Sequence, residues 1–466
     1  MTAELLKRLI EVLGDRAVIV QPDAQAPYLV DQRGYYQGAA AAVVRPASTR
    51  QVADVVGIAR ELGVGIVPQG GNTGLCGGAT PDDGGAQIVL SLEKLNAIRE
   101  VSTVDYSMTV EAGVILQSIH DAASAHDLFF PLDLAAKGSC QIGGNLSTNA
   151  GGINVLRYGN ARDLVLGVEV VLADGSIWNG LSSLRKDNTG YDLKHLFLGS
   201  EGTLGIITAA VLKLFPNPLH RRTAMLAVAN PEAACRLLGV ARNLSGDAVE
   251  SYEYISREAL ECVLEGMGKT DPFSEVHGHY VLMELASGAD GAVLDRMLER
   301  IVERGMEDEE ILDGVLAQNE RQREELWQLR ELISEAQKHS VKNDVSVPIA
   351  SLPRFLAEAG QKVTASAPGA RPCPFGHIGD GNIHYNILAP DSGDPAEFRG
   401  RHGAGLIDAV SDLAMSLDGS FSAEHGVGQL RRDMMKRYKS PEALTLMRNL
   451  KSMMDPDGIL NPGKVV

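Results

Sequence analysis

Four side chains near the C-terminal end of the chain have the types and spacing of a metal site with a base beside it. His377 and His384 lie in the segment Gly-His-Ile-Gly-Asp-Gly-Asn-Ile-His, and Glu424 and His425 lie in Ser-Ala-Glu-His-Gly. Two imidazoles and one carboxylate suit a divalent, zinc-like ion and leave one coordination position open. His425 is next to the carboxylate and is suited to act as a general base near neutral pH. The sequence therefore predicts a metal centre formed by His377, His384 and Glu424.

A glycine-rich loop and a strand are the elements that must position these residues. His377 lies in the loop, where glycine lets the backbone bend tightly. The run 384–388 is predicted to be a strand, so Asn386 shares a face with His384 and Tyr385 lies on the other face. Histidines in such loops also occur as structural residues bonded to the backbone, and this alternative stays open. Alone, the cluster indicates metal-assisted chemistry, with hydrolysis as the default.

The length and composition indicate a multidomain globular protein. A chain of 466 residues exceeds one ordinary core, so we expect two or three domains. Its content of 44% hydrophobic and 22% charged residues is typical of soluble proteins. The net charge of −17 argues against binding to nucleic acid or to anionic membranes.

The cysteines and the N-terminus predict a cytoplasmic protein. The five cysteines are scattered and lack metal-finger spacing, which is typical of reduced thiols. Residues 4–13 predict a short amphipathic helix and not a signal peptide. No stretch approaches the roughly 18–20 apolar residues of a membrane span.

The first half of the chain alternates short β-rich runs with helical ones. A helix is predicted at 49–62, with Ser48 as its N-cap. The predicted strands of this half are 42–46, 65–68, 87–91, 108–111, 164–172 and 205–214. Pro216-Asn217-Pro218 interrupts the pattern and marks a domain boundary. The second region differs, with long charged helices at 293–304 and 318–339 and a β run at 279–285.

Three glycine-dense stretches in the first half favour a dinucleotide cofactor. They occur at 68–75, 138–152 and 199–208. Glycine lets main-chain amides approach a pyrophosphate closely, and Ser, Thr and Asn add hydrogen bonds. Each stretch alone is also typical of a plain turn. None has the Gly-x-Gly-x-x-Gly pattern, so a nicotinamide-binding Rossmann domain is disfavoured.

On these stretches, residues 43–216 resemble the FAD-binding domain of the vanillyl-alcohol oxidase/p-cresol methylhydroxylase (VAO/PCMH) superfamily. The second half, with the closing Asn461-Pro-Gly-Lys, is similar to the C-terminal domain of FAD-linked oxidases. The resemblance implies an α+β fold, with a PCMH-type FAD-binding domain of two α+β subdomains and a cap domain of antiparallel β-sheet and helices. We expect residues 1–216 to bind FAD, 217–440 to form the substrate-binding cap, and 441–466 to return to the FAD domain.

The resemblance also implies which residues contact FAD. Covalent members often carry a histidine where this chain has Asn72, so noncovalent FAD is expected. The expected FAD contacts are Pro68, Gln69, Gly70, Gly71, Asn72, Thr73, Gly74, Leu75, Gly138, Ser139, Gly143, Gly144, Asn149, Gly151, Gly152, Glu201, Gly205, Ile206, Ile207 and Asn461.

A cationic group in the second half suits an anionic substrate. Arg330 and Ser334 are four residues apart on a predicted helix and so lie on one face. An arginine fork binds a carboxylate through two hydrogen bonds, and a hydroxyl adds a donor beside it. Lys342 follows the helix, and a second cation fits a dicarboxylate better than a monocarboxylate. The alternative that Arg330 and Lys342 are ordinary solvated charges stays open.

Within the superfamily the chain is most similar to dehydrogenases of D-2-hydroxy acids. The resemblance implies oxidation of D-2-hydroxyglutarate to 2-oxoglutarate by hydride transfer to flavin N5, with D-lactate or glycolate as alternative substrates. It implies that the three metal ligands bind the substrate through a zinc-like ion, and that His425 takes the hydroxyl proton. The substrate contacts implied are Arg330, Ser334, Lys342, Asn386 and His425.

Partners follow only from the resemblance. An electron-transfer flavoprotein is the implied electron acceptor, with quinone or oxygen as alternatives, and a homodimer is expected. Two other classes stay open: a zinc-dependent hydrolase whose first half binds a nucleotide, and a noncatalytic subunit of a larger oxidase complex.

Overall fold

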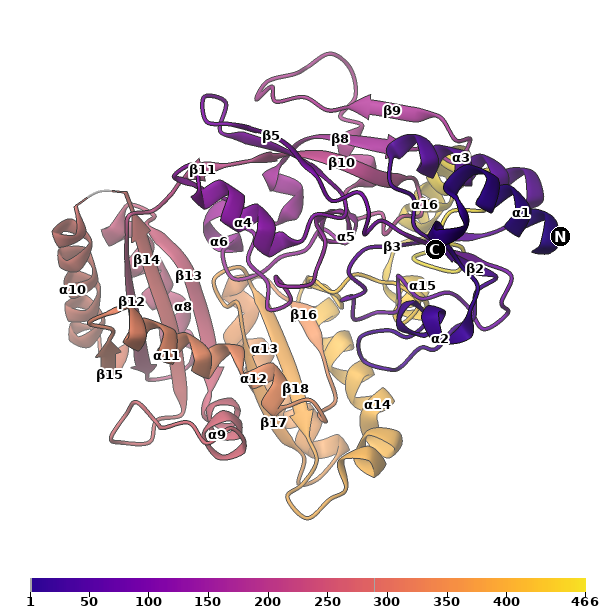
Figure 1. The fold of residues 1–466 in the computed structure, drawn as a ribbon. Coiled ribbons are helices and arrows are strands. Elements are labelled where there is room, and N and C mark those ends of the chain that lie inside the picture. Colours follow the sequence, from indigo (N-terminus) through magenta and orange to yellow (C-terminus); the bar gives the residue numbers. More distant parts are fainter. Residues whose placement is uncertain (1, 289) are drawn as a thin grey trace. The chain divides into compact units, whose positions relative to one another are not determined.

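The computed structural model describes residues 2–288 and 290–466, which form two compact units (Figure 1). The first unit comprises Met1–Gly152, Gly159–Asn217 and Glu424–Val466, and the second comprises Ile153–Tyr158 and Pro218–Ala423. The chain thus returns to the first unit at Glu424, earlier than the expected 441. The reason is that Val427 and Gly428 donate their N–H groups to the buried Glu201 carboxylate, at 2.7 and 2.8 Å. A short segment, Ile153–Tyr158, also belongs to the second unit and not to the first.

The first sheet of the first unit is mostly parallel and buried. Its strand order is β1 (Val18–Ile19), β2 (Ala42–Val44), β4 (Ile88–Ser91) and β3 (Ile66–Gln69), with only β1 antiparallel. Every residue of β2 and β4 is buried, as expected for parallel strands covered on both faces. Helix α3 (Thr49–Leu62) packs Val52, Val55 and Val56 into the same core. The Ser48 side chain accepts from Gln51 N–H, which confirms the predicted cap and contributes about 1 kcal/mol.

The second sheet of this unit is antiparallel. Its order is β5 (Ile98–Ser102), β6 (Ser107–Glu111), β10 (Ile206–Lys213), β8 (Val165–Val171) and β9 (Ile177–Gly180). A two-stranded sheet joins β11 (Phe215–Pro216) to β7 (Leu128–Phe129). The remaining α-helices of the unit are α1 (Thr2–Leu13), α2 (Pro22–Gln25), α4 (Leu116–Ser124), α5 (Ile142–Ser147), α7 (Lys194–Phe197), α15 (Arg432–Tyr438) and α16 (Pro441–Met454). These two sheets with their helices are the two α+β subdomains that the sequence predicted.

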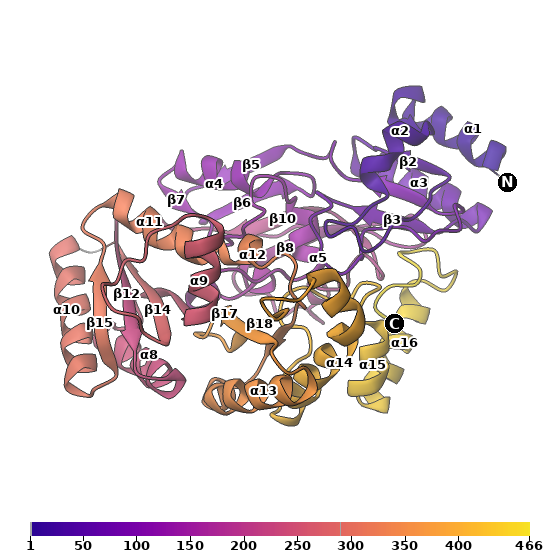
Figure 2. The same ribbon diagram turned by 90° about the horizontal axis from the view of Figure 1, so that it is seen from below.

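The second unit is built on a seven-stranded antiparallel sheet. Its order is β15 (Ile311–Leu316), β12 (His220–Val228), β14 (His279–Ser287), β13 (Val249–Ser256), β17 (Arg371–Gly376), β18 (Asn382–Leu388) and β16 (Asp344–Ser346). Helices cover both faces of this sheet (Figure 2). One face carries α8 (Pro231–Ser245), α10 (Gly291–Glu307), α13 (Leu352–Ser366) and α14 (Pro395–Ser416). The other carries α9 (Arg257–Gly266), α11 (Glu320–Glu331) and α12 (Ile333–Ala336). The unit also contains the short helix α6 (Val155–Tyr158).

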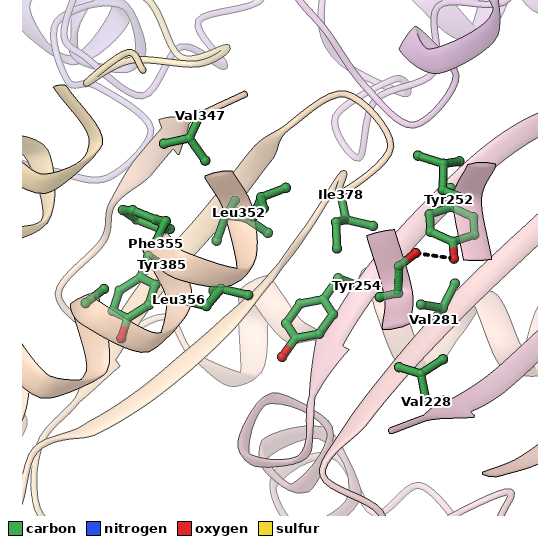
Figure 3. Packing of buried hydrophobic residues seen from close by; sticks show 14 of the residues in the cluster. Val228, Tyr252, Tyr254, Val281, Val347, Leu352, Phe355, Leu356, Ile378 and Tyr385 are labelled. Carbon is green, nitrogen blue, oxygen red and sulfur yellow. Dashed lines mark hydrogen bonds between the residues drawn. The ribbon is translucent and has the colours of Figure 1, made fainter. Parts of the chain in front are cut away.

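Side chains of each strand alternate between the two cores of this unit. On β13, Tyr252 and Tyr254 enter the core under α8 and α13, whereas Ile255 enters the core under α9 and α11. The Tyr252 hydroxyl donates to the Ala234 carbonyl at 2.8 Å, so its one polar atom is satisfied although the side chain is buried (Figure 3). Tyr385 of β18 belongs to the first of these cores, next to Phe355. Residues at even positions of β18, including His384 and Asn386, therefore point to the α9/α11 face.

The predicted elements are found with small differences in their ends. The helix predicted at 318–339 is instead two helices, α11 and α12, separated at Leu332. Leu332 keeps right-handed helical dihedral angles and its N–H still donates to the Gln328 carbonyl, so the axis is only interrupted. Among the described residues, no helix is long and apolar enough to cross a membrane.

Candidate active site

The three glycine stretches of the first unit come together. A Cβ added at Gly71 would lie 2.2 Å from the Ser139 carbonyl oxygen, and one at Gly202 would lie 3.0 Å from Pro68. The Glu201 N–H donates to the Ser147 carbonyl at 2.8 Å, which joins the third stretch to the second. Glycine is thus required at 71 and 202 because another backbone or ring occupies the space of a side chain.

Four residues that were expected to contact FAD have left-handed backbones. Asn72, Asn149, Glu201 and Asn461 have φ values of 53°, 51°, 53° and 43°. Such angles are uncommon outside glycine and concentrate at ligand-binding sites. Asn tolerates them best, and three of the four are Asn. The backbone in these loops is therefore held in conformations that present main-chain groups in unusual directions.

The C-terminal tail is hydrogen-bonded to these loops. Asn461 donates from Nδ2 to the carbonyls of Gly78 and Glu201, at 2.9 and 2.7 Å. The Glu201 carboxylate accepts the N–H groups of Val427 and Gly428. Burial raises the pKa of Glu201, although the two N–H donors act against this rise. The side chains of Glu201 and Asn461 thus form hydrogen bonds with backbone groups of the protein, which fix the positions of these two residues.

A cavity of about 830 Å³ opens beside these loops in the first unit. It is lined by several expected FAD contacts, namely Gln69, Gly70, Gly71, Asn72 and Ser139. The Gln141 Oε1 atom at its edge is buried, and the described residues offer it no hydrogen-bond partner. A cavity that is bordered by two loop glycines and an unsatisfied acceptor fits a nucleotide cofactor, whose hydroxyl and amine groups are donors.

The other expected FAD contacts vary in their surroundings. Gly144, Gly138 and Gly74 have open space where a Cβ would be, as a site of close ligand approach requires. Gly205 is needed for packing, since a Cβ there would lie 2.6 Å from Val170. Ile206 and Ile207 are buried on β10. The sequence did not single out most of the cavity lining, which includes Tyr28, Arg45 and Gln141.

In the second unit, most of the predicted residues lie on the hairpin of β17 and β18 and on helices α11 and α12. His377 follows β17, and His384 and Asn386 are on β18. Arg330 is near the end of α11, and Ser334 is on α12. Antiparallel pairing of β17 with β18 sets Phe375 opposite His384 and closes the loop that carries His377. The hairpin therefore brings together two histidines that are seven residues apart.

Glu253 of β13 joins His377 to Arg330. Its Oε1 lies 2.6 Å from His377 Nδ1, and its Oε2 accepts from Arg330 Nε at 2.7 Å. The Glu253 side chain is only 1% exposed. Burial raises its pKa, but His377 and Arg330 outweigh burial and lower the pKa to about 2. The carboxylate is thus ionised and held between a predicted metal ligand and a predicted substrate ligand.

The two histidine rings are packed against each other. Their centroids are 5.5 Å apart at an interplanar angle of 77°. Asp344 of β16 pairs with His384 across the sheet, and its Oδ1 lies 3.7 Å from His384 Nδ1. Because Nδ1 of His377 faces Glu253, Nε2 is the atom through which His377 would bind a metal. A carboxylate behind each imidazole is the usual support of a metal-binding histidine, so the donors here fit a divalent ion.

Two of the other residues predicted to bind the substrate, Lys342 and Ser334, are in contact with each other. Lys342 Nζ donates to the Ser334 carbonyl at 3.4 Å, so the second cation lies next to α12. Ser334 is exposed and Lys342 is partly buried. Asn386 is buried, and its Nδ2 donates to Gln337 Oε1 at 2.9 Å. Burial raises the pKa of the Asp380 carboxyl, in the loop after His377, to about 6.

Glu424 and His425 are the first residues of the segment that returns to the first unit. There Glu424 Oε2 accepts from the Gly152 N–H at 3.3 Å, and its Oε1 lies 3.7 Å from His425 Nε2. The preceding residue, Ala423, donates its N–H to the carbonyl of Asp344 at 3.3 Å within the second unit. Ala423 is thus the last residue of the second unit's long segment, and Glu424 begins the next segment of the first unit.

Two carboxylates beside the predicted histidines, Glu253 and Asp344, were not predicted as site residues from the sequence. Glu253 is 124 positions from His377 and 77 from Arg330, so no local spacing connects them. One signal was present in the sequence, where Glu253 stands between two tyrosines. In the structure, every residue of that strand is buried. A charged residue on a buried strand needs a charged partner, which makes it a candidate for a functional site.

The fold and the glycine loops define the class as a flavoprotein of the VAO/PCMH type. Residues 40–180 match the family described as "FAD binding domain", and residues 217–465 match "FAD linked oxidases, C-terminal domain". The chain belongs to this FAD-linked oxidase family, binds FAD and is an oxidoreductase.

Relatives in the family carry more specific names. A "D-2-hydroxyglutarate dehydrogenase" of Xanthomonas citri pv. viticola is 41% identical over 432 residues, 91% of this chain and 89% of that protein. A "D-2-hydroxyglutarate dehydrogenase, mitochondrial" of Bos taurus is 38% identical over 455 residues, 96% of this chain and 81% of that protein.

Solved structures with little sequence identity share the fold. A p-cresol methylhydroxylase with bound substrate superposes with a TM-score of 0.79 at 17% identity, covering 99% of this chain and 96% of that chain. An alkyldihydroxyacetonephosphate synthase gives a TM-score of 0.75 at 17% identity, covering 99% and 84%. These likenesses confirm the predicted α+β fold.

Proposed function

We propose that this protein is an FAD- and divalent-metal-dependent dehydrogenase that oxidises D-2-hydroxyglutarate to 2-oxoglutarate. The observation that carries the proposal is the chain of contacts from His377 through Glu253 to Arg330. In this proposal, the imidazole that would bind the metal and the guanidinium that would bind a carboxylate share one buried glutamate. A substrate that uses both must have an oxygen ligand for the metal at one end and a carboxylate at the other, as this diacid does. The names of the relatives support the same substrate.

His377, His384 and Glu424 would hold the metal ion, and the first unit would hold FAD noncovalently. When bound, the ion supplies Lewis acidity at the substrate hydroxyl, and the flavin supplies the hydride acceptor N5. The chain's own residues position the substrate and move its proton.

His425 would accept the hydroxyl proton as general base, because imidazole is the side chain best suited to proton transfer near neutral pH. Arg330 would bind the distal carboxylate through its Nη atoms, because Nε is bonded to Glu253. Ser334 and Lys342 would complete the carboxylate site, and Asn386 would help to orient the substrate. Holding both ends fixes the Cα–H bond in one direction, which lowers the entropic part of the barrier.

The test is anaerobic bleaching of the bound flavin by a panel of 2-hydroxy acids, with and without chelation. We expect D-2-hydroxyglutarate to bleach it fastest, its L enantiomer not at all, and chelation to stop the reaction until Zn²⁺ is restored. Faster bleaching by D-lactate or glycolate would contradict the dicarboxylate site. Bleaching that survives chelation would contradict the metal. Flavin that stays on the denatured, filtered protein would contradict noncovalent binding.

We also propose an electron-transfer flavoprotein as acceptor, a homodimer and a cytoplasmic location. The acceptor is tested by reoxidation of the bleached enzyme with purified electron-transfer flavoprotein, quinone or oxygen. Sedimentation measures the assembly, and cell fractionation the location. Faster reoxidation by quinone or oxygen, a monomer in sedimentation, or recovery outside the cytoplasm would each contradict the corresponding part.

A further inference from the structure

Glu253 is a buried carboxylate to which the proposed chemistry assigns no contact with the substrate, the flavin or the metal. It is on β13, and both its oxygens are engaged within the second unit: Oε1 with His377 Nδ1 at 2.6 Å and Oε2 with Arg330 Nε at 2.7 Å. An ionised carboxylate is retained in a protein interior only where cations or donors compensate the loss of water. Here the two compensating groups are a predicted metal ligand and a predicted substrate ligand.

Ring contacts close a circuit through the same residues. The Arg330 guanidinium lies 4.8 Å from the centroid of the Phe375 ring, and that ring lies 5.1 Å from the His384 ring. The His384 and His377 rings are 5.5 Å apart. Glu253 connects His377 back to Arg330. Every member of this circuit is packed against two others, so a change in the position of Glu253 is passed to both imidazoles and to the guanidinium.

The bond to Glu253 determines what His377 can do. A carboxylate only accepts hydrogen bonds, so His377 Nδ1 must carry a proton, and the lone pair of the neutral ring is then on Nε2. A carboxylate behind the ring also makes the metal-binding nitrogen more basic. The bond to Arg330 acts in a parallel way. It uses Nε and leaves the two Nη atoms as the donors for an incoming carboxylate.

We propose that Glu253 is a positioning residue that sets the Nδ1–H tautomer of His377 for metal binding and the orientation of Arg330 for carboxylate binding. The inference rests on the proposed function, because it assumes that His377 binds the metal. One side chain then aligns the metal half and the carboxylate half of the substrate site. Loss of its charge weakens both.

A second glutamate of the sheet supplies a matched control. Glu284 of β14 is buried to a similar extent, with 3% of its side chain exposed, and it also pairs with an arginine of α11. Its Oε2 accepts from Arg323 Nε at 2.6 Å and from Trp327 Nε1 at 2.9 Å. The Thr223 hydroxyl donates to the same oxygen, and none of these three partners is a histidine. Glu284→Gln therefore removes a buried charge from the same face without changing a metal ligand.

The experiment compares Glu253→Gln, Glu284→Gln and the wild type, all loaded with FAD. Zn²⁺ affinity is measured by competition with a chromogenic chelator, and Co²⁺ is added to record the ligand-field spectrum. We expect Glu253→Gln to bind Zn²⁺ about 10–100-fold more weakly and to change the Co²⁺ spectrum. We expect Glu284→Gln to match the wild type in both, even if its melting temperature falls.

The outcomes separate the inference from the proposed function. If the wild type binds no Zn²⁺ in the same titration, the proposed metal dependence is wrong. If the wild type binds one ion and Glu253→Gln binds it equally well, the positioning role is wrong and the proposed function stands. Equal weakening in both variants would show a general loss of stability and would also overturn the role of Glu253.

A measurement on the unaltered protein covers the case in which Glu253→Gln does not fold. The tautomer of His377 is read from ¹⁵N–¹H correlations of the histidine side chains in the metal-free, FAD-loaded protein. The His377 signal is assigned by its loss in His377→Gln. We expect the proton on Nδ1, and a proton found only on Nε2 would overturn the inference.

Discussion

Two arginines of helix α11 pair with two buried glutamates on neighbouring strands, and the two glutamates differ in their other hydrogen-bond partners. Arg323 binds Glu284 of β14, and Arg330, seven residues later on the same side of the helix, binds Glu253 of β13. Seven residues are about two turns, so both arginines face the sheet. In both pairs, an arginine of α11 neutralises a buried glutamate of the sheet.

The third partner separates them. Glu284 uses its remaining capacity on the Trp327 indole at 2.9 Å and on the Thr223 hydroxyl, which are packing residues of the same core. The other oxygen of Glu253 is hydrogen-bonded to His377. A buried ion pair is therefore no sign of function by itself. It becomes one where the pair continues into a group that can bind a metal or transfer a proton.

The largest expected effect comes from removing each arginine. Arg330→Met should lower kcat/KM for D-2-hydroxyglutarate by at least about 100-fold, since charged hydrogen bonds are worth about 1.5–3 kcal/mol each. It should also cost about 3–5 kcal/mol of unfolding free energy, because Glu253 is left buried without one partner. Arg323→Met should destabilise the fold but leave kcat/KM of the folded enzyme within about twofold of wild type. Steady-state kinetics and urea unfolding measure both, and equal kinetic losses would remove the distinction.

Lysine at the same two positions tests geometry at constant charge. Arg330→Lys should lower kcat/KM for D-2-hydroxyglutarate about 10–100-fold, because an ammonium does not bind Glu253 and grip a carboxylate in a planar fork at once. D-Lactate, which has no distal carboxylate, should be affected less. Arg323→Lys should leave the ratio of the two substrates unchanged. A loss that is the same for both acids would contradict the role of Arg330 at the distal end.

The contribution of the Glu284–Arg323 pair to stability should fall when the pH is lowered. Burial raises the pKa of Glu284, but Arg323, Thr223 and Trp327 outweigh it, so the pKa is below its ordinary value of 4.5. The charged form therefore stabilises the fold above about pH 4.5, and this contribution is lost as the pH falls further. Glu284→Gln should cost about 2 kcal/mol at pH 7. Denaturation between pH 7 and 3.5 should show that difference shrinking below pH 4.5, and a growing difference would contradict the assigned sign.

The smallest expected effect concerns Lys342. Lys342→Ala should raise KM for D-2-hydroxyglutarate about two- to fivefold, with little change for D-lactate, because one partly exposed charge–charge contact is lost. Stability should change by less than about 0.5 kcal/mol. Lys338→Ala is the matched control, since Lys338 is an exposed lysine four residues earlier that pairs with Glu335 at 3.1 Å. Equal effects of Lys338→Ala and Lys342→Ala would indicate general electrostatic attraction of an anion.

Local patterns made much of the fold predictable. The cap at Ser48, the helix 49–62 and the strand faces at His384 and Asn386 all follow from short-range geometry, and the structure confirms them. The chain was expected to return to the first domain at residue 441, but it returns at Glu424. This point depends on hydrogen bonds to Glu201, more than two hundred residues away. Strand order and domain boundaries are set by such long-range contacts, which propensity and periodicity do not report.

For the active site, the sequence by itself determined the chemical types: two histidines on one hairpin, a Glu-His dipeptide, and an arginine with a lysine beyond it. It also determined that glycine-rich loops lie in the first half. Only the tertiary structure decided that β13 pairs with β17, which brings Glu253 to His377 across 124 positions of sequence. The physical reason is that a buried carboxylate selects its partners in space. Its two oxygens must be satisfied by whatever donors the neighbouring strand and helix provide, and here those donors are His377 and Arg330.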